Sequence, residues 1–484
     1  MLSIVHSKQI KKDFSIEATS LHLFYGYLII TIGGVLLFLA ISHILYQKRS
    51  PTSMTAWMLA IIFMPFITVP LYFLIGIRKR ENKYTKASIQ LHEAHQKNIH
   101  IDITPSNALT NILEKNGIPP ATKGNRYELI TKDTEAYTRL MNEIEKATES
   151  IDLGTYVFSY DVTTEKILEA LTKRASEGIR VRLLLDVVGS LGSYLRQKNF
   201  QALRNAGGEV GFFIPIMSRP FQSYINLRNH RKIYLFDRKR LLSGGMNLSD
   251  DYLGEESSTK RWDDILYYLE GPAVFGFYEI FHNDWNYASG QTTPLELLHE
   301  PVEAVGENSV QVVPSGPDIP TDALYEALLN AIYTCRKRIW IVTPYFVPDE
   351  NIVQALIIAQ HKGIDVKLIT PKHSDNWIAD LGRSPYMREL DAIGVDVILY
   401  EGEMLHAKAI LFDNMGGMIG SVNIDNRSLF LNYEIVTFAY STQLIESIES
   451  WMQELMKNST RGMKQPTKLR EAVENIMKVF APLL

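Results

Sequence analysis

A histidine and a lysine lie two positions apart in the stretch NHRKIYLFD, residues 229–237. The alternating apolar residues predict a strand, in which successive side chains point to opposite faces. His230 and Lys232 would therefore share one face, and Asp237 would point to the other. A histidine can act as a nucleophile or as a general acid and base, and a lysine can hold an anion. Taken alone, however, a solvated strand end is the simpler interpretation of so short a pattern.

The same H-x-K-x4-D pattern occurs a second time in LHAKAILFD, residues 405–413, with His406, Lys408 and Asp413. In both copies an asparagine follows the histidine by 17 residues, at the end of a tight turn of small residues. The turn residues are Gly244, Gly245 and Asn247 in the first copy and Gly420, Ser421 and Asn423 in the second. Two copies with the same sequel are much rarer by chance than one, so the solvated-strand interpretation is rejected.

A further carboxylate follows each copy at the start of an apolar strand, Asp264 in RWDDILYYLEGPAV and Glu434 in LNYEIVTFAY. A turn or an edge charge would explain either one alone, but their equivalent placement favours a shared role. A carboxylate that accepts a hydrogen bond from an imidazole fixes the ring and stabilises its protonated form. Asp237 and Asp413 fall on the strand face opposite their histidines, so we expect them to anchor the structure near the site.

Two lysines and two amides that converge on one cavity can bind a tetrahedral oxyanion such as a phosphodiester. One neutral histidine can attack phosphorus to form a phosphohistidine, while the other, protonated, donates to the departing oxygen and later removes a proton from the acceptor. Neither half is complete alone, so we expect the two strands to face each other across one cleft. No metal or other cofactor is required, and a lysine beside each histidine disfavours a histidine-bound cation.

Helices and strands alternate from Arg126 onward, and the rhythm restarts near residue 320, which predicts an α/β fold. The first half has helices at 133–150 and 164–178 and strands at 151–160 and 179–189; the second has helices at 321–337 and 350–363 and strands at 338–346 and 364–370. Gly178 and Gly363 are predicted helix C-caps. The pattern indicates an internal duplication, with α-β-α domains at 123–300 and 301–484 and a boundary within 291–307.

Two long uncharged intervals precede this body, between Glu17 and Lys48 and between Ser50 and Ile77. They predict a hairpin of two transmembrane helices at about 22–45 and 56–77 within residues 1–80, followed by a linker at 81–122. A cleaved signal and a buried hairpin in a soluble protein fit less well. The flanks of the hairpin carry more Lys and Arg than the link QKRSPTS, so we expect both termini and the body on the cytoplasmic side, with prolines 65 and 70 as kinks.

The bulk composition adds few constraints on function. The 484 residues carry a net charge of -4, so composition does not suggest a nucleic-acid partner. The single cysteine, Cys335, excludes an internal disulfide and is expected to be a buried thiol. Near the C-terminus, Leu469, Val473, Ile476, Met477 and Phe480 recur at helical spacing. We expect this stripe to pack against the body, with lipid contact as the alternative.

The paired motifs with their G-[GS]-x-N sequels resemble the phospholipase D superfamily. The membrane hairpin, RNHRK, GGMN, EGPAV, TPYFVPDE, GSVNIDNRSLFLNYE and a closing APLL resemble the bacterial cardiolipin synthases within it, over nearly the whole chain. The first half departs from the usual W-R-D spelling and reads Trp262, Asp263, Asp264. The distance back from EGPAV favours Asp264 as the aspartate that orients its histidine.

The resemblance implies an enzyme of the bacterial cytoplasmic membrane that transfers a phosphatidyl group between two phosphatidylglycerol molecules, giving cardiolipin and glycerol. It implies that His230 is the nucleophile and His406 the general acid and base. The predicted catalytic set is His230, Lys232, Asp237, His406, Lys408 and Asp413; the predicted phosphate ligands are Asn247, Asn423, Gly245 and Ser421; the predicted orienting carboxylates are Asp264 and Glu434.

Other functions remain possible from the sequence. They are a hydrolytic phospholipase D, a transferase that uses another phospholipid or alcohol, a nuclease, and a membrane scaffold without activity. The two intact motifs disfavour the scaffold, and the apolar N-terminal segments disfavour the nuclease. The choice between transfer and hydrolysis depends on how well the site positions an alcohol in a partly dehydrated cavity.

Overall fold

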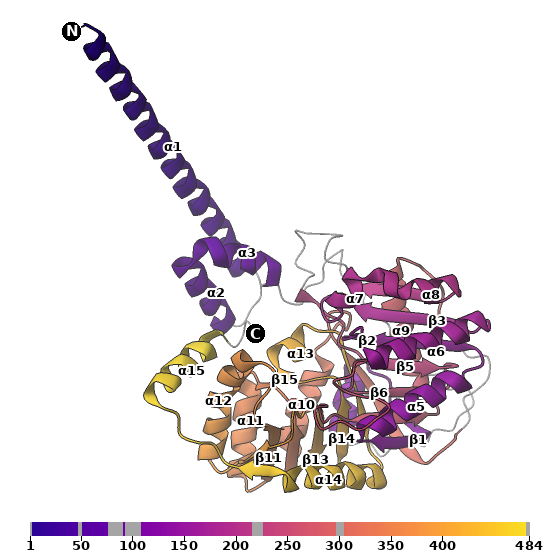
Figure 1. Cartoon of the computed structure of the whole chain (residues 1–484). Coiled ribbons are helices and arrows are strands. Elements are labelled where there is room, and N and C mark those ends of the chain that lie inside the picture. The colour runs from indigo at the N-terminus through magenta and orange to yellow at the C-terminus, as the bar shows by residue number, and fades with distance from the viewer. Residues whose placement is uncertain are drawn as a thin grey trace. The chain divides into compact units, whose positions relative to one another are not determined.

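The computed structural model describes residues 2–46, 51–75, 91, 108–214, 226–296 and 304–480. The chain forms two compact units, the N-terminal residues up to Arg78 and a body that holds nearly all of the remaining chain (Figure 1). Several predicted features lie outside the described residues: the hairpin link at 47–50, nearly all of the linker before residue 108, the middle of the predicted domain boundary, and the closing APLL.

The N-terminal unit contains α1 (Leu2–Tyr46), α2 (Pro51–Phe63) and α3 (Pro65–Ile75). Among the described residues, only Leu23–Tyr46 is long and apolar enough to cross a membrane. The second predicted span is divided at Met64, because a proline disfavours helical backbone at the residue before it. Its two pieces, of 13 and 11 residues, are each shorter than the roughly 20 residues that a membrane requires. Neither piece alone is therefore long enough to span a membrane, and the structure shows one candidate span among the described residues.

The body is built on one 15-stranded sheet with the order β17-β12-β11-β9-β13-β14-β16-β8-β1-β7-β6-β5-β2-β3-β4. The first half supplies β1 (Thr122–Ile130), β2 (Ser150–Thr155), β3 (Arg180–Asp186), β4 (Glu209–Phe213), β5 (Ile233–Phe236), β6 (Arg240–Gly244) and β7 (Leu266–Glu270). The second supplies β8 (Asn308–Ser315), β9 (Arg338–Val342), β11 (Asp365–Pro371), β12 (Asp396–Tyr400), β13 (Ala409–Phe412), β14 (Gly416–Gly420), β16 (Glu434–Ala439) and β17 (Ser459–Arg461). A separate pair joins β10 (Phe346–Val347) to β15 (Ile424–Asp425).

The same strand order occurs in both halves of the sheet. Outward from the centre, where β1 and β8 pair antiparallel, the order is β1-β7-β6-β5-β2-β3-β4 in one direction and β8-β16-β14-β13-β9-β11-β12 in the other. In each half the parallel pair, β2 with β3 and β9 with β11, is joined by a helical crossover. This repetition agrees with the duplicated α/β fold predicted from the sequence.

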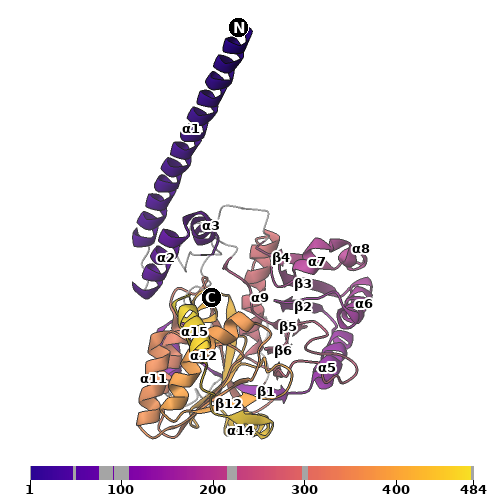
Figure 2. The ribbon, with the colours of Figure 1, turned by 60° about the vertical axis from the view of Figure 1, so that its left-hand side comes forward.

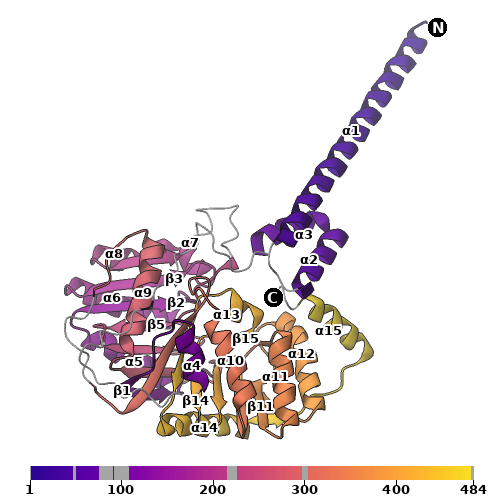
Figure 3. The ribbon, with the colours of Figure 1, turned by 180° about the vertical axis from the view of Figure 1, so that it is seen from behind.

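Helices cover both faces of the sheet. The helix α4 (Ala108–Lys115) precedes the first half and packs against the second. The first half contains α5 (Asp133–Lys146), α6 (Val162–Ser176), α7 (Leu191–Leu195), η1 (Gln197–Phe200), α8 (Gln201–Asn205) and α9 (Val274–Ser289). The second contains α10 (Ala323–Thr334), α11 (Glu350–His361), α12 (Trp377–Ala392), α13 (Asn426–Phe430), α14 (Thr442–Lys457) and α15 (Lys468–Phe480). Figure 2 shows β2 to β6 between α9 and the pair α5 and α6. Figure 3 shows α10, α11 and α12 together over the second half.

In the described part of the body, the buried apolar side chains form three clusters that follow these layers. Residues of α9 and α14 share one cluster, those of α10 and α11 a second, and those of α5 and α6 a third. Cys335 lies in the second cluster and is buried, as predicted. Burial raises its pKa to about 12, so the thiol stays protonated at neutral pH.

Glycines end the crossover helices where the sequence predicted them. Gly178 and Gly363 follow α6 and α11 with φ of 90° and 79°, a region that residues with a side chain rarely adopt. Gly178 N donates to Ala175 O, which satisfies a carbonyl at the helix end. At the other end of each helix, Asp161 and Asp349 accept a backbone N–H of the first turn. The caps fix where each crossover enters the next parallel strand.

The C-terminal helix α15 packs in a different way from the prediction. Leu469, Val473 and Ile476 of the apolar stripe are exposed, with Leu469 78% exposed. The helix lies against α12 through its charged face instead, because Glu474 is buried and pairs with Arg388. The expectation that these apolar residues pack against the body was therefore wrong.

Candidate active site

The two histidine segments enter their strands later than predicted. β5 begins at Ile233 and β13 at Ala409, so the histidine and the lysine of each motif precede the strand. The backbone before each strand bonds to the opposite half instead. His230 N donates to Tyr433 O at 2.9 Å, and His406 N donates to Asp263 O at 2.7 Å. The backbone of each histidine is therefore held by a hydrogen bond to the other half of the body.

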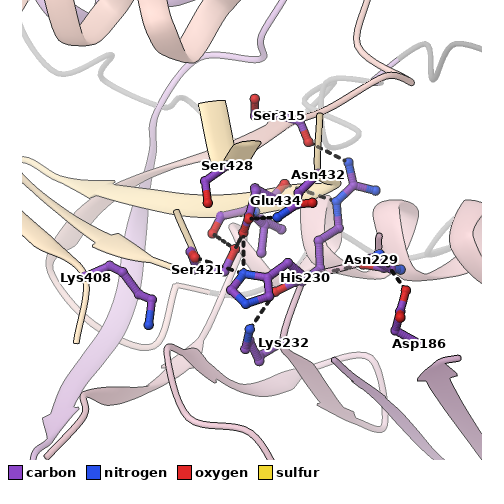
Figure 4. Close-up of polar contacts among 12 residues, drawn as sticks. Asp186, Asn229, His230, Lys232, Ser315, Lys408, Ser421, Ser428, Asn432 and Glu434 are labelled. Atoms are coloured by element: carbon purple, nitrogen blue, oxygen red, sulfur yellow. Dashed lines mark hydrogen bonds and ion pairs between the residues drawn. The ribbon is translucent and has the colours of Figure 1, made fainter. Parts of the chain in front are cut away.

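Each imidazole also contacts a carboxylate of the opposite half. His230 Nδ1 lies 3.0 Å from Glu434 Oε2 (Figure 4), and His406 Nδ1 lies 2.7 Å from Asp264 Oδ2. In the second pair the contact is made by Asp264 and not by the preceding aspartate. The sequence identified both carboxylates, but their spacing along the chain gave no reason to expect the exchange.

The two carboxylates are ionised at neutral pH. Burial opposes the ionisation of Asp264, but Lys408 and the contact with His406 outweigh it and lower the pKa of Asp264. The pKa of Glu434 is lowered in the same way by His230 against the effect of burial. An ionised carboxylate can only accept, so each ring donates from Nδ1–H. This leaves the Nε2 lone pair of each ring for chemistry.

Burial keeps both imidazoles neutral in the free protein. Burial lowers the pKa of His230, and burial together with Lys408 lowers the pKa of His406 to about 3. Lys232 and Lys408 are themselves almost fully buried, and burial lowers their pKa values to about 7 and about 8. Lys232 Nζ donates to His230 O at 2.9 Å, and Lys408 Nζ lies 3.0 Å from His406 Nε2. A bound anion would favour the charged form of all four groups.

Both histidines line one cavity of about 390 Å³. Its wall contains Tyr156, Val157, His230, Asn247, Tyr252 and Trp262 from the first half, and Tyr345, Val347, Asp375, Asn376, Ile378, Ala379, His406, Asn423, Asp425, Arg427, Ser428 and Asn432 from the second. Four of the predicted site residues are therefore in the wall, the two histidines and the two asparagines. The other predicted site residues are not in this wall.

The two motif asparagines present their amides to the cavity in different ways. Asn247 Oδ1 accepts from Val157 N at 3.2 Å and from Thr155 Oγ1 at 3.4 Å, which leaves its NH₂ group to donate into the cavity. Asn423 is 6% exposed, and its Oδ1 has no hydrogen-bond partner within the described residues. A buried amide without a partner indicates a position that a ligand or water occupies.

Gly245 and Ser421 lie beside the carboxylates, and the structure does not place them in the cavity wall. A Cβ on Gly245 would lie 2.0 Å from Asp264 Oδ1, so only glycine allows this approach. Ser421 occupies the equivalent position, and its hydroxyl donates to Glu434 Oε2 at 2.5 Å. This placement speaks against the predicted phosphate contacts and gives both residues the role of positioning a carboxylate.

Asp237 and Asp413 lie away from the cavity and bind backbone. Asp237 accepts the N–H groups of Thr148, Glu149 and Ser150, with distances of 2.7 to 3.1 Å. Asp413 accepts those of Arg336, Lys337 and Arg338, each at 2.8 Å. Both have positive φ, 54° and 50°, at the turn after the motif strand. In each half the aspartate therefore ties the motif strand to the start of the antiparallel strand beside it, β5 to β2 in the first half and β13 to β9 in the second.

Aromatic side chains surround the two imidazoles and were not predicted. The Tyr156 ring lies edge-on to His230, with centroids 4.9 Å apart. Tyr252 and Trp262 lie 5.2 and 5.3 Å from the His406 ring. They exclude water from the rings and strengthen the electrostatic interactions there. Trp262 stands in the quoted segment RWDDILYY, but a single tryptophan before a strand carries no signal of its own.

No group of three or more His, Cys, Asp or Glu side chains in the described part of the chain is arranged to hold a metal ion. The positive charge near the histidines comes instead from Lys232 and Lys408. The arrangement can bind an anion between two imidazoles that each have a carboxylate partner. That set of groups suits two successive displacements at one phosphorus atom.

Comparisons with known proteins agree with this chemistry. The family model described as "Cardiolipin synthase, PLD-like domain" matches residues 140–285 and 328–456, and "Phospholipase_D-nuclease N-terminal" matches residues 35–76. A cardiolipin synthase 1 of Bacillus anthracis is 30% identical over 96% of this chain and 95% of its own length. A cardiolipin synthase of Clostridium perfringens is 31% identical over 90% of this chain and 95% of its own length.

The fold is also similar to a solved structure. The phosphatidylserine synthase of Haemophilus influenzae superposes with a TM-score of 0.58 over 78% of this chain and 97% of that protein. The two sequences are 15% identical, so the likeness concerns the fold.

Proposed function

Because the chain belongs to the bacterial cardiolipin synthase family of the phospholipase D superfamily, we propose that it transfers a phosphatidyl group between two phosphatidylglycerol molecules. The products are cardiolipin and glycerol. The observation that carries this proposal is the crossed pairing of His230 with Glu434 and of His406 with Asp264. It supplies one cavity with two imidazoles, each held by its own carboxylate, as two successive transfers require.

In the first transfer, His230 Nε2 attacks the phosphorus of the donor lipid. The N–P bond forms while the bond from phosphorus to the glycerol oxygen breaks, and protonated His406 gives its proton to that oxygen. Glycerol leaves as a neutral alcohol, and the phosphatidyl group remains on His230. The assignment of the nucleophile to the first half rests on the resemblance to the superfamily.

In the second transfer, the free hydroxyl of another phosphatidylglycerol attacks the same phosphorus. His406, now neutral, removes the proton of that hydroxyl while the N–P bond breaks, which restores both rings. Asp264 and Glu434 hold the rings and stabilise the positive charge that each carries in turn.

The bound phosphodiester favours the protonated form of His406 that the first transfer needs. With a pKa of about 3, His406 is neutral in the free protein, largely because it is buried and Lys408 is adjacent. The anion of the donor offsets the charge of Lys408 and raises the pKa of the imidazole. We infer that Asn247 and Asn423 donate to the phosphate from the cavity wall, and that the buried Lys232 and Lys408 contribute positive charge in their protonated forms.

The membrane segment brings the body to its lipid substrates. We infer that the N-terminal segment crosses the membrane twice, with both termini and the body in the cytoplasm. We also infer that the body consists of two domains, at residues 123–300 and 301–484. The buried Cys335 is the only cysteine, so a single new cysteine can report topology with little background. Arg49→Cys in intact cells should react with a membrane-impermeant maleimide, and Lys83→Cys should react only after lysis. Protection of Arg49→Cys in intact cells would contradict the two-span arrangement.

The function itself is tested with the full-length protein in vesicles of phosphatidylglycerol, with the products followed by mass spectrometry. We expect cardiolipin and glycerol in equal amounts. Phosphatidic acid alone would show hydrolysis, and cleavage of DNA without lipid transfer would show a nuclease. His361→Ala, at the exposed end of α11, is the matched control for a histidine variant of the site.

A further inference from the structure

The two halves of the chain contribute different side chains to the cavity wall at equivalent positions. A threonine marks equivalent positions in the two halves, since Thr155 Oγ1 donates to Val157 O and Thr343 Oγ1 donates to Tyr345 O. The side chain two residues after the threonine faces the cavity in both halves. It is the apolar Val157 on the first side and the hydroxyl-bearing Tyr345 on the second. The second side therefore offers hydrogen bonds where the first offers an apolar surface.

Tyr345 is joined to a carboxylate at the rim of the cavity. Its hydroxyl donates to Asp375 Oδ1 at 2.5 Å. The two are held in place by Arg383, which is 1% exposed and bonds Pro344 O at 3.2 Å and Pro371 O at 2.7 Å. Arg383 thus fixes the turn that carries Tyr345 against the loop that leads to Asp375. This rigid support is what a binding group at the rim requires.

In the first half, the carboxylate after the corresponding strand is buried and binds backbone N–H groups. At the end of β3, Asp186 is 1% exposed and accepts the N–H groups of Val188, Gly189 and Asn229 at 2.8 to 3.1 Å. Its carboxylate holds the backbone near His230 and is not part of the cavity wall. Asp375, by contrast, is exposed and is part of the cavity wall.

Asp375 lies on the same side of the cavity as His406. Burial lowers the pKa of Lys408, the lysine beside that ring, and the charge of Asp375 is one of those that partly offset this effect. The amide of Asn423, whose buried Oδ1 lacks a partner in the described residues, belongs to the same wall. The side-chain oxygens of Tyr345, Asp375 and Asn423 can therefore each accept a hydrogen bond in the cavity that His406 also lines.

We propose that Tyr345, Asp375 and Asn423 form the subsite for the glycerol headgroup, both the one that leaves the donor and the one that brings the accepting hydroxyl. This inference rests on the proposed function, in which His406 touches both oxygens in turn. The two oxygens pass through the same position, so their remaining hydroxyls meet the same side chains. Water lacks those hydroxyls and gains nothing from the subsite, which favours transfer over hydrolysis.

The charges of this side favour a neutral polyol over an ammonium headgroup. Arg427 lines the same cavity, and Lys408 lies next to His406. Burial raises the pKa of Asp425 in the wall to about 6, so most of this carboxyl is ionised at neutral pH. An ammonium group would meet the carboxylates of Asp375 and Asp425 but also the two cations. Hydroxyl groups can bond to all of these side chains without an electrostatic cost.

The test measures how one covalent intermediate divides between two alcohols. The full-length protein is given cardiolipin as phosphatidyl donor, with deuterium-labelled glycerol and 1-propanol together as acceptors, and labelled phosphatidylglycerol and phosphatidylpropanol are measured. The phosphatidylglycerol that leaves cardiolipin in the first transfer carries no label, so the two measured products both come from the same phosphohistidine and their ratio reports acceptor recognition. We expect the wild-type protein to prefer glycerol.

The variants Tyr345→Phe and Asp375→Asn should lower the ratio of phosphatidylglycerol to phosphatidylpropanol, about threefold to tenfold for the tyrosine and tenfold or more for the aspartate. Tyr333→Phe on α10, which is 45% exposed, is the matched control and should keep the wild-type ratio. An unchanged ratio in both site variants, with total transfer retained, would overturn the subsite. A wild-type preference for ethanolamine over glycerol would overturn the polyol assignment. Absence of any alcohol transfer by the wild type would overturn the proposed function itself.

Discussion

Asp264 Oδ2 lies 2.7 Å from His406 Nδ1, although the two residues are 142 positions apart and belong to opposite halves of the sheet. Glu434 and His230 form the reciprocal pair, 204 positions apart. An imidazole without its carboxylate loses both its orientation and the stabilisation of its charged form. Each half therefore completes the site of the other, which explains why the two copies of the motif remain in one chain.

Asp264→Asn should lower the rate of cardiolipin formation by about 10²- to 10⁴-fold, because the amide keeps the shape of the side chain but cannot stabilise a protonated imidazole. Glu434→Gln should have an effect of the same order through His230. The rates are measured in phosphatidylglycerol vesicles, and thermal unfolding checks that each variant is folded. A folded Asp264→Asn variant with the wild-type rate would show that the crossed contact has no catalytic role.

Gly245→Ala should lower the rate roughly 100-fold, since a displacement of about 1 Å in a catalytic group can have that effect. The new Cβ would lie 2.0 Å from Asp264 Oδ1 and would push the carboxylate away from His406. Gly192→Ala is the matched control, because no heavy atom lies within 4 Å of a Cβ built there. Equal rates for the two alanine variants would argue against the close approach.

Asp237→Ala should destabilise the fold by about 2–4 kcal/mol, since three backbone N–H groups lose their acceptor. These bonds outweigh burial and lower the pKa of Asp237 below its usual 3.8. Its stabilisation is therefore present above about pH 4 and is lost as the pH falls through the folded-state pKa. Chemical denaturation at pH 7 and at about pH 3 should show a smaller difference from the wild type at the lower pH. A fully stable variant that has lost activity would instead give Asp237 a direct role in the chemistry.

Donor binding should weaken as the pH rises from about 6.5 to 9. Burial lowers the pKa of Lys232 to about 7 and that of Lys408 to about 8, so both lysines lose their charge across this range in the free protein. The phosphodiester then finds less positive charge, and KM for phosphatidylglycerol should rise. Initial rates at several lipid densities measure KM at each pH. A constant KM over this range would exclude the two lysines as the anion-binding charge.

The sequence predicted the duplicated fold and four residues of the cavity wall, the two histidines and the two asparagines, because both follow from a motif that occurs twice. It could not predict which carboxylate serves which histidine, since distance along the chain says nothing about the exchange of segments between halves. The pair of Tyr345 and Asp375 was missed for the same reason, because these two residues are 30 positions apart, one in a turn and the other in a loop. The packing of α15 was predicted wrongly because periodicity finds an apolar face, whereas the ion pair of Arg388 with Glu474 decides which face is buried.

The most direct test of the account is to locate the phosphatidyl group on the protein during turnover. The wild-type enzyme is denatured while it consumes phosphatidylglycerol, digested at alkaline pH to preserve phosphohistidine, and analysed by mass spectrometry. The account predicts a phosphatidyl adduct on the peptide that contains His230, and none in the His230→Ala variant, which should form no cardiolipin, like His406→Ala. An adduct on the His406 peptide, or rapid cardiolipin formation without any adduct, would contradict it.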